Sequence, residues 1–270
     1  MLFGLIGFVI YPLLPNRFID GWHLFNPRQS WIIVVVVSGL GFLNYVLLRL
    51  YSHRGLYYTA ALGGLVNSTA TVAELSRALP RGQASSMAVA LVLLTSVAMF
   101  IRNLAILAIF MPAAVSIAIW PLAAMAIGAA YFAWRKRDEG TAPVSPLHMS
   151  SPVSLRYVLS LAGIFVIMEI LGTIAARYLG KYGFLTLSLL GGTVSSASTT
   201  AAAATMAIHG KLSPDVAGVA TVFASIASAL VNLPLVQRQT RDKRLTRTLT
   251  AISLLLVAAG LVVLAVRRSY

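Results

Sequence analysis

Long apolar stretches without charged residues recur along this chain and constrain its fold more than any other feature. Residues 31–50, for example, contain no charged side chain before Arg49. An α-helix needs about 20 apolar residues to cross about 30 Å of hydrocarbon, because each residue adds about 1.5 Å. The further stretches are residues 56–79, 84–110, 113–134, 155–176, 183–208, 216–236 and 248–266. We therefore predict an all-α fold, a polytopic bundle of transmembrane helices with about 8–9 hydrophobic segments.

The composition narrows the class of protein further. Of the 270 residues, 59% are hydrophobic and 10% are charged. Soluble domains average roughly 45–50% apolar and about 25% charged residues, so a soluble enzyme and a disordered chain are excluded. The formal net charge is +14, but basic residues of membrane proteins lie mostly in loops that face the anionic leaflet. We therefore expect the lipid bilayer, and no nucleic acid, as a partner.

We expect residues 1–270 to form one membrane domain with two halves. The segment 138–154 contains three prolines and predicts a linker between a first half, residues 16–137, and a second half, residues 155–270. The apolar segment before Pro15 is short for a span. It predicts either a tilted first helix or the remnant of a longer one, if the natural chain begins upstream.

Two segments rich in small residues align without a gap. Residues 63–79, GGLVNSTATVAELSRAL, and 191–207, GGTVSSASTTAAAATMA, are identical at six aligned positions. These pairs are Gly63/Gly191, Gly64/Gly192, Val66/Val194, Ser68/Ser196, Thr71/Thr199 and Ala73/Ala201. With one residue of slippage, Asn103-Leu104 then aligns with Asn232-Leu233. We predict that the two halves are copies of one unit, an arrangement common among transporters.

The small residues of these segments leave two interpretations open. Ridges of small residues allow close packing of helices, with each hydroxyl bonded to its own helix. The alternative is a broken or re-entrant segment whose hydroxyls and freed backbone groups line a pathway. The same residue types serve both purposes, so composition alone does not choose between them.

The distribution of basic residues favours the re-entrant interpretation. If every segment from Trp31 onward crosses the membrane, Lys and Arg number 11 on one side and 9 on the other, leaving out Arg102. If residues 56–79 and 183–208 enter and leave by the same side, the numbers become 13 and 7. Positive residues concentrate on the cytoplasmic side of membrane proteins. This arrangement leaves three crossings per half, an odd number, and therefore predicts inverted repeats.

Three charged residues lie within the apolar stretches: Glu74, Arg102 and Glu169. A charge at the bilayer centre costs about 2.5–3.5 kcal/mol or more, so these side chains should face the bundle interior. One interpretation is a structural ion pair between Arg102 and Glu169. The other makes Glu74 or Glu169 a carboxylate that binds a proton or a cation, with neutral oxygen ligands from nearby polar residues. The candidate binding or pathway residues are Asn67, Ser68, Thr71, Glu74, Arg102, Asn103, Glu169, Ser195, Ser196, Thr199 and Asn232.

Residue patterns typical of catalysis are missing from the sequence. The four histidines lie in loops or at segment ends, so a serine nucleophile in the Ser-rich segments would have no adjacent base. The chain contains no cysteine, which excludes thiolate metal sites, and it lacks the paired His/Glu spacing of a zinc site. We expect a protein that is not an enzyme and has no cofactor, and the residues do not predict which metal it could bind.

Several short motifs together resemble the pattern of a known family. They are Asn26-Pro27-Arg28 with Trp31, GGLVNSTAT at residues 63–71, and Ser76-Arg77. From about Leu13 to its end, the chain is similar to the membrane domain that follows the MgtC/SapB-type domain in bacterial membrane proteins. The sequence departs from the common arrangement of that family because it does not include the N-terminal MgtC-like half, and we expect either a split, stand-alone version or a chain whose start is truncated.

The resemblance implies a multi-pass protein of the bacterial inner membrane. MgtC-type relatives are associated with growth at low magnesium and with regulation of other membrane machinery. Those roles attach to the MgtC-like half. For this chain we expect a relation to divalent cations, and either a homo-oligomer or an MgtC-like partner. We expect a transporter or channel for a small ion or solute. The alternative is a non-transporting membrane subunit that binds and regulates a partner membrane protein.

Overall fold

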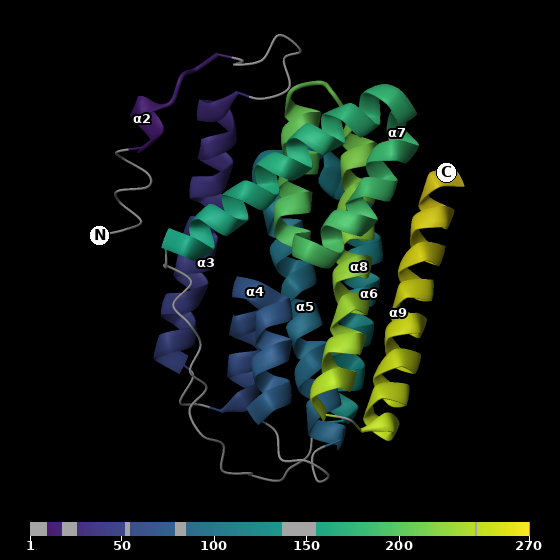
Figure 1. The fold of residues 1–270 in the computed structure, drawn as a ribbon. Coiled ribbons are helices and arrows are strands. Elements are labelled where there is room, and N and C mark those ends of the chain that lie inside the picture. Colours follow the sequence, from purple (N-terminus) through teal and green to yellow (C-terminus); the bar gives the residue numbers. More distant parts are fainter. Residues whose placement is uncertain are drawn as a thin grey trace. The chain divides into compact units, whose positions relative to one another are not determined.

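The computed structural model describes residues 10–17, 26–51, 55–78, 85–136, 155–240 and 242–269. The predicted linker, residues 138–154, lies outside these ranges. The secondary-structure elements of the described residues are all helices (Figure 1), which confirms the predicted all-α fold. They are α2 (Tyr11–Leu13), α3 (Pro27–Tyr51), α4 (Leu56–Ala78), α5 (Ser85–Phe110), α6 (Pro112–Arg135), α7 (Leu155–Ile208), α8 (Pro214–Thr240) and α9 (Lys243–Ser269).

Five helical segments within the described ranges are long and apolar enough to cross a membrane. They are Ser86–Phe110, Pro112–Arg135, Ala162–Ile208, Pro214–Thr240 and Lys243–Arg267. A helix suits the hydrocarbon core because it satisfies its backbone N–H and C=O groups internally. The predicted class, a membrane protein with transmembrane helices, is thus supported, whereas the count of eight or nine segments stays a prediction.

The long helix α7 consists of segments that pack against each other. Gly180 has φ +62° and ψ −154°, a conformation that suits a residue without a β-carbon. A β-carbon added at Gly172 would lie 2.6 Å from Cε2 of Phe184, although a straight helix would separate these residues by about 18 Å. The parts of α7 before and after Gly180 therefore lie side by side, and Figure 1 shows the reversal. They correspond to the predicted stretches 155–176 and 183–208.

The chain divides into two compact units. Unit 1 comprises Met1–Phe42, Asn103–Ala118 and Ser151–Ala227, and unit 2 comprises Leu43–Arg102, Ile119–Ser150 and Ser228–Tyr270. Each unit combines residues from the first and the second half of the sequence. The units therefore do not coincide with the predicted halves, and the boundary between units passes through α3, α5, α6 and α8.

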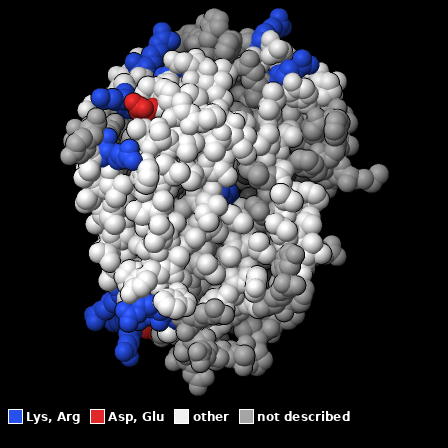
Figure 2. Space-filling model, turned by 180° about the vertical axis from the view of Figure 1, so that it is seen from behind, with Lys and Arg blue, Asp and Glu red and all other residues white. Residues whose placement is uncertain are grey.

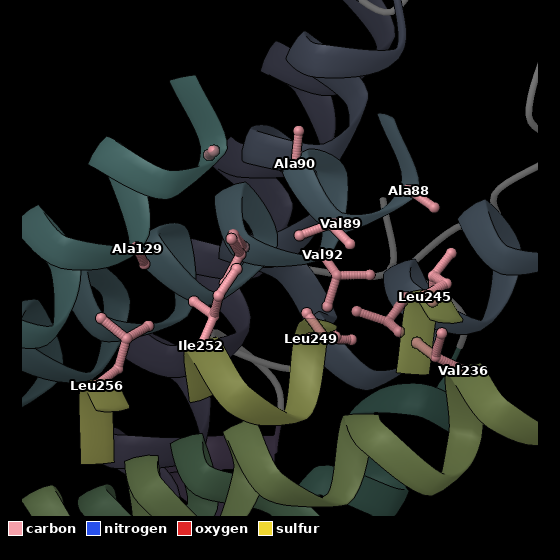
Figure 3. Close-up of a cluster of buried hydrophobic side chains, with 13 residues drawn as sticks. Ala88, Val89, Ala90, Val92, Ala129, Val236, Leu245, Leu249, Ile252 and Leu256 are labelled. Atoms are coloured by element: carbon pink, nitrogen blue, oxygen red, sulfur yellow. The ribbon is translucent and has the colours of Figure 1, made fainter. Parts of the chain in front are cut away.

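The core of unit 2 is a cluster of aliphatic side chains from five helices (Figure 3). Five of its residues lie near the start of α5 and four on one face of α9, with two from α6 and one each from α4 and α8. The members are Val72, Ala88, Val89, Ala90, Val92, Leu93, Ala129, Ala133, Val236, Leu245, Leu249, Ile252 and Leu256. Alanines on α5 and α6 allow the neighbouring helices to approach closely.

The core of unit 1 joins α3, α5 and both parts of α7. Its members are Val34, Val37, Ile106, Ala162, Phe165, Met168, Ala197, Ala201 and Ala202. Large side chains from α3 and the first part of α7 pack on alanines of the last part of α7. The small-residue stripe predicted from the sequence is therefore a packing surface in this unit.

Many helical side chains that face outward are apolar. Ile127 and Trp134 on α6 are 70% and 73% exposed, and Tyr178 on α7 is 67% exposed. Figure 2 shows Lys and Arg gathered in groups, with broad areas of the visible face free of charged side chains. Contact with lipid would keep these apolar side chains out of water.

Candidate functional site

A break at Asn67 interrupts α4. Asn67 has φ −152° and ψ 102°, an extended backbone between two helical segments. Its Oδ1 accepts a hydrogen bond from the backbone N–H of Ala70 at 3.1 Å. This bond to the third residue of the following segment is the standard role of an asparagine at a helix N-cap. Asn67 therefore begins a second helical segment within α4.

The two segments of α4 fold back on each other. A β-carbon added at Gly63 would lie 2.6 Å from Oγ1 of Thr71, whereas a straight helix would hold these residues about 12 Å apart. The Thr71 hydroxyl donates to the carbonyl oxygen of Asn67 at 2.8 Å. In Figure 1 the two short segments of α4 lie next to each other. The broken-helix interpretation of residues 63–71 thus describes α4.

The same geometry recurs at Ser195 in α7. Ser195 has φ −159° and ψ 102°, and its Oγ accepts from the backbone N–H of Ser198 at 3.2 Å. The Thr199 hydroxyl donates to the carbonyl oxygen of Ser195 at 2.9 Å. A β-carbon added at Gly191 would lie 2.6 Å from Oγ1 of Thr199. Each of these contacts around Ser195 has a counterpart around Asn67. The residues that make the counterpart contacts are those that the gapless sequence alignment pairs.

The second glycine of each pair packs against the following helix. A β-carbon added at Gly64 would lie 2.5 Å from the carbonyl oxygen of Thr95 on α5. A β-carbon added at Gly192 would collide with the backbone of Ala224 on α8. At both positions a residue with a β-carbon would collide with the neighbouring backbone, so only glycine allows this close packing of the helices.

Arg102 binds a carbonyl group beside the break in α4. In a continuous helix, the carbonyl of Val66 would accept from the N–H of Ala70. The Ala70 N–H donates to Asn67 Oδ1 instead, and the guanidinium of Arg102 donates from Nη1 to Val66 O at 3.0 Å. Arg102 is only 8% exposed. Its charge thus lies where α4 loses its regular hydrogen bonding.

The two aligned asparagines differ in their hydrogen bonding. Asn103 on α5 is fully buried, and its amide donates to Oγ of Ser225 at 3.0 Å. Asn232 on α8 is also fully buried, but within the described ranges neither its Oδ1 nor its Nδ2 has a hydrogen-bond partner. An unsatisfied buried polar group costs about 1–3 kcal/mol. Water or a ligand is the expected partner for such an amide.

Glu169 is the buried carboxylate of unit 1. It is 1% exposed, and its Oε2 accepts a hydrogen bond from Oγ of Ser30 at 2.8 Å. The predicted partner, Arg102, belongs to unit 2 and is bonded to Val66 there. The ion pair between Arg102 and Glu169 therefore stays a prediction.

Glu74 differs from the other candidate residues in its exposure. Its side chain is 38% exposed and lies 3.9 Å from Arg77, one turn later on α4. Exposed pairs of this kind contribute little to stability, about 0–1 kcal/mol. Glu74 therefore has a local partner at the end of α4, rather than the buried setting expected from its place in an apolar stretch.

The candidate residues fall into two groups. Unit 2 contains Asn67, Ser68, Thr71, Glu74, Arg102 and Asn232, and unit 1 contains Asn103, Glu169, Ser195, Ser196 and Thr199. Ser68, Ser196, Thr71 and Thr199 are all buried. Among the described residues, no three His, Cys, Asp or Glu side chains lie close enough to hold a metal ion.

Two polar residues of these groups were not among the candidates. Ser30 bonds Glu169, and Ser225 accepts from Asn103. Ser30 lies inside the Asn26–Trp31 motif, so its position in that motif was an available signal. Ser225 carried no comparable signal, because its role depends on the packing of α8 against α5.

The described helices and their apolar exposed surface define the class: a helical membrane protein with two broken, folded-back helical segments. A family model for a domain of unknown function, DUF4010, matches residues 35–238. The chain belongs to this family. No curated protein and no solved structure matches the chain.

Proposed function

We propose that this protein is a transporter or channel for a small ion or solute, built from two inverted repeats. The observation that carries the proposal is the pair of breaks at Asn67 and Ser195. Freed backbone groups at membrane depth are tolerated where they are buried in protein or line a cavity, and broken helices of this kind bind substrates in transporters. Among the described residues, each unit contains one break of this kind, with an N-cap hydrogen bond and a supporting threonine at equivalent positions.

The packing of the second glycine of each pair supports a relation between the two halves. Gly64 lies against Thr95 on α5, and Gly192 lies against Ala224 on α8. The two contacted residues are one residue further apart in the sequence than the two glycines are. The same slippage aligns Asn103 with Asn232. These contacts support a repeat that includes α5 and α8.

The packing of α3 on α7 supports inversion of the repeats. In unit 1, Ser30 near the start of α3 bonds Glu169. Val34 and Val37, further along α3, belong to a cluster that contains Phe165 and Ala162, which lie earlier on α7. The two helices therefore run antiparallel. In the proposed repeat, α3 and the first part of α7 are equivalent helices. The symmetry operation that relates them must therefore reverse the direction of the helix. A two-fold axis in the membrane plane does this.

The folding back of α4 agrees with a re-entrant segment. α4 is not among the helices of the described ranges that are long and apolar enough to cross a membrane. If α4 and residues 183–208 each return to the side from which they enter, Lys and Arg number 13 against 7. The side with 13 is then cytoplasmic. We infer that this face points toward the cytoplasm, which by the MgtC/SapB resemblance is that of a bacterial cell.

The resemblance to the membrane domain of MgtC/SapB proteins remains part of the proposal. It brings Mg²⁺ and other divalent cations into the set of substrates to be tested. The neutral oxygens of the buried Ser, Thr and Asn side chains suit hard cations. The alternative function, a non-transporting subunit that regulates a partner membrane protein, predicts no flux by the purified chain.

Flux measurements on purified protein in proteoliposomes test the proposal. The panel is Mg²⁺, Na⁺, K⁺, chloride, phosphate and small neutral solutes. Asn67→Ala and Ser195→Ala each remove a cap worth about 1 kcal/mol, which corresponds to about fivefold in a conformational equilibrium. We expect flux of at least one species, lowered about fivefold or more by either variant.

Exchanged caps are the matched controls for this experiment. Asn67→Ser and Ser195→Asn each introduce the residue of the other break, so both should retain flux. Ser116→Ala removes an exposed hydroxyl that bonds the carbonyl of Ala113 and should have no effect. Absence of flux for the whole panel by folded wild-type protein would contradict transport and favour the regulatory subunit.

A further inference from the structure

Glu169 places a carboxylate among apolar side chains. The breaks in α4 and α7 do not explain why a carboxylate lies there. Its neighbours on α7, Phe165 and Met168, belong to a buried cluster with Val34 and Val37 of α3. A buried charge without compensation is costly, so a carboxylate in such a place takes up a proton or a counter-ion. The chemistry around Glu169 distinguishes these two possibilities.

The hydrogen-bond donor to Glu169 comes from the motif Asn26–Trp31. Pro27 is the first residue of α3, a position that suits proline because its missing N–H is not needed there. The backbone N–H of Ser30 donates to the carbonyl of Asn26 at 3.0 Å. Ser30 is 2% exposed, and its hydroxyl donates to Glu169 Oε2. The motif thus begins α3 and presents one hydroxyl to the buried carboxylate.

The charged groups on the elements that pack around Glu169 can be named one by one. On α7 itself they are Arg156, Arg177 and Lys181. On α3, the Arg28 guanidinium donates to Pro12 O at 2.9 Å and lies 5.3 Å from the ring centroid of Tyr11. Residues 103–118 and 183–208 contain no ionisable side chain. Further along unit 1 come His209 and Lys211, which follow α7, and Asp215 at the start of α8. Lys211 acts on Glu169 electrostatically.

These surroundings suit a proton better than a metal cation. Ca²⁺ and Mg²⁺ take about six or more oxygen ligands. Within the described ranges, the side chain of Glu169 has a single hydrogen-bond partner, the Ser30 hydroxyl. A proton needs only one carboxylate oxygen, and a neutral carboxyl group can both donate and accept a hydrogen bond.

We propose that Glu169, held by Ser30, is a proton-binding site, and that binding and release of the proton drive transport. The second part rests on the proposed transport function, whereas the first does not. The site has a direct contact with the break in the same unit. A β-carbon added at Gly191 would lie 2.6 Å from Sδ of Met168, the neighbour of Glu169, and Gly191 lies one turn before Ser195. Through this contact, protonation of Glu169 would act on the break at Ser195.

Labelling with carbodiimides tests the proton-binding site without a transport assay. An apolar carbodiimide, dicyclohexylcarbodiimide, reaches buried carboxyl groups and reacts with their protonated form. Purified full-length protein is labelled across a pH series, and modification of Glu169 is measured by peptide mass spectrometry. We expect modification to increase as the pH falls, by about tenfold per pH unit on the alkaline side of the titration. Ser30→Ala should shift the pH midpoint, because it removes the hydrogen bond to the carboxylate.

Matched controls separate the site from general effects of pH. Glu74, with its 38% exposed side chain, should react with a water-soluble carbodiimide instead. Glu169→Gln keeps the size of the side chain and should abolish the label while eluting as one folded species in gel filtration. Labelling is repeated at constant pH in NaCl, MgCl₂ and choline chloride. Protection by Na⁺ or Mg²⁺ but not by choline would overturn the proton site in favour of a metal cation.

Flux measurements then test the coupling separately. An imposed pH gradient should change the rate of substrate flux by wild type, and Glu169→Gln should remove that dependence. Flux that is unaffected by both would overturn the coupling. Labelling that follows pH, in a protein without flux for any substrate, would support the proton site and contradict the transport function. Folded wild type whose Glu169 is not labelled at any pH would overturn the site even if transport is found.

Discussion

The guanidinium of Arg102 donates a hydrogen bond to the carbonyl oxygen of Val66, 3.0 Å away, at the point where α4 is broken. At the break, the N–H of Ala70, which a regular helix would offer to this carbonyl, donates to Asn67 Oδ1. The charge on α5 thus stabilises a backbone conformation on α4 in the same unit. At the position of the second half that aligns with Arg102 stands Val231, so the two breaks are supported differently.

Arg102→Met should destabilise the protein by about 1.5–3 kcal/mol, because the buried hydrogen bond that a charged group donates to Val66 O is lost. Arg102→Lys should recover part of this loss. Thermal unfolding in detergent measures both variants. Arg135→Met is the control, because Arg135 is exposed and bonds only Tyr131 in the described part of the chain; it should change stability by less than about 0.5 kcal/mol. Equal stability of Arg102→Met and wild type would contradict this role of Arg102.

The glycines that touch a neighbouring backbone should not tolerate a β-carbon. Gly64→Ala and Gly192→Ala place a methyl group against backbone atoms of Thr95 and Ala224. Backbone cannot move aside as a flexible side chain can, so we expect each variant to lose about 1–3 kcal/mol of stability or to fail to fold. Gly163→Ala is the control, since nothing lies within 4 Å of a β-carbon there; it should be neutral or stabilise α7 by about 0.5–1 kcal/mol. Thermal unfolding compares the three variants.

The aligned asparagines should respond in opposite ways to replacement by leucine, which has a similar shape. Asn103→Leu removes the donor to Ser225 Oγ and should destabilise the protein by about 1 kcal/mol. Asn232→Leu removes an amide without a partner within the described ranges, so stability should be unchanged or increased. If Asn232 binds water or substrate in the pathway, the same variant should lose flux. A destabilised Asn232→Leu with normal flux would contradict this interpretation.

The sequence predicted the helical class and the segments that contain the breaks, but not the residues at which α4 and α7 reverse. Asn67 and Ser195 are good N-cap residues, but Ser68, Thr69 and Ser196 are equally suited by type. Which residue becomes the cap depends on contacts made elsewhere, such as Gly64 against Thr95. The motif Asn26–Trp31 was a signal for Ser30 itself, but the pairing of Ser30 with Glu169 could not be predicted, for the same reason. Ser30 is distant in sequence, and only the packing of α3 against α7 brings them together.

Acidification should destabilise the protein through His209, which lies just beyond the apolar segment of α7. Burial lowers the pKa of His209 from its ordinary value of 6.5, and the positive charge of Lys211 lowers it further. The unfolded chain therefore binds the proton more readily than the folded protein, and stability falls as the pH decreases through about 6.5. We expect the melting temperature to decrease from about pH 7.5 to about pH 5.5. His209→Gln should weaken this dependence, and an identical slope in that variant would exclude His209 as its source.

Membrane topology is the last prediction, because it decides whether α4 crosses the bilayer. The chain has no cysteine, so single cysteines can be introduced without removing any native residue of that type. Positions 53 and 81 flank α4 and lie outside the described residues. If α4 is re-entrant, His53→Cys and Arg81→Cys are labelled by a membrane-impermeant maleimide from the same side of intact spheroplasts or vesicles. Position 111, between α5 and α6, serves as the reference and should be labelled from the other side, since α5 is long and apolar enough to span. Labelling of positions 53 and 81 from opposite sides would make α4 a crossing helix, and the two halves would then have four crossings each and could not be inverted repeats.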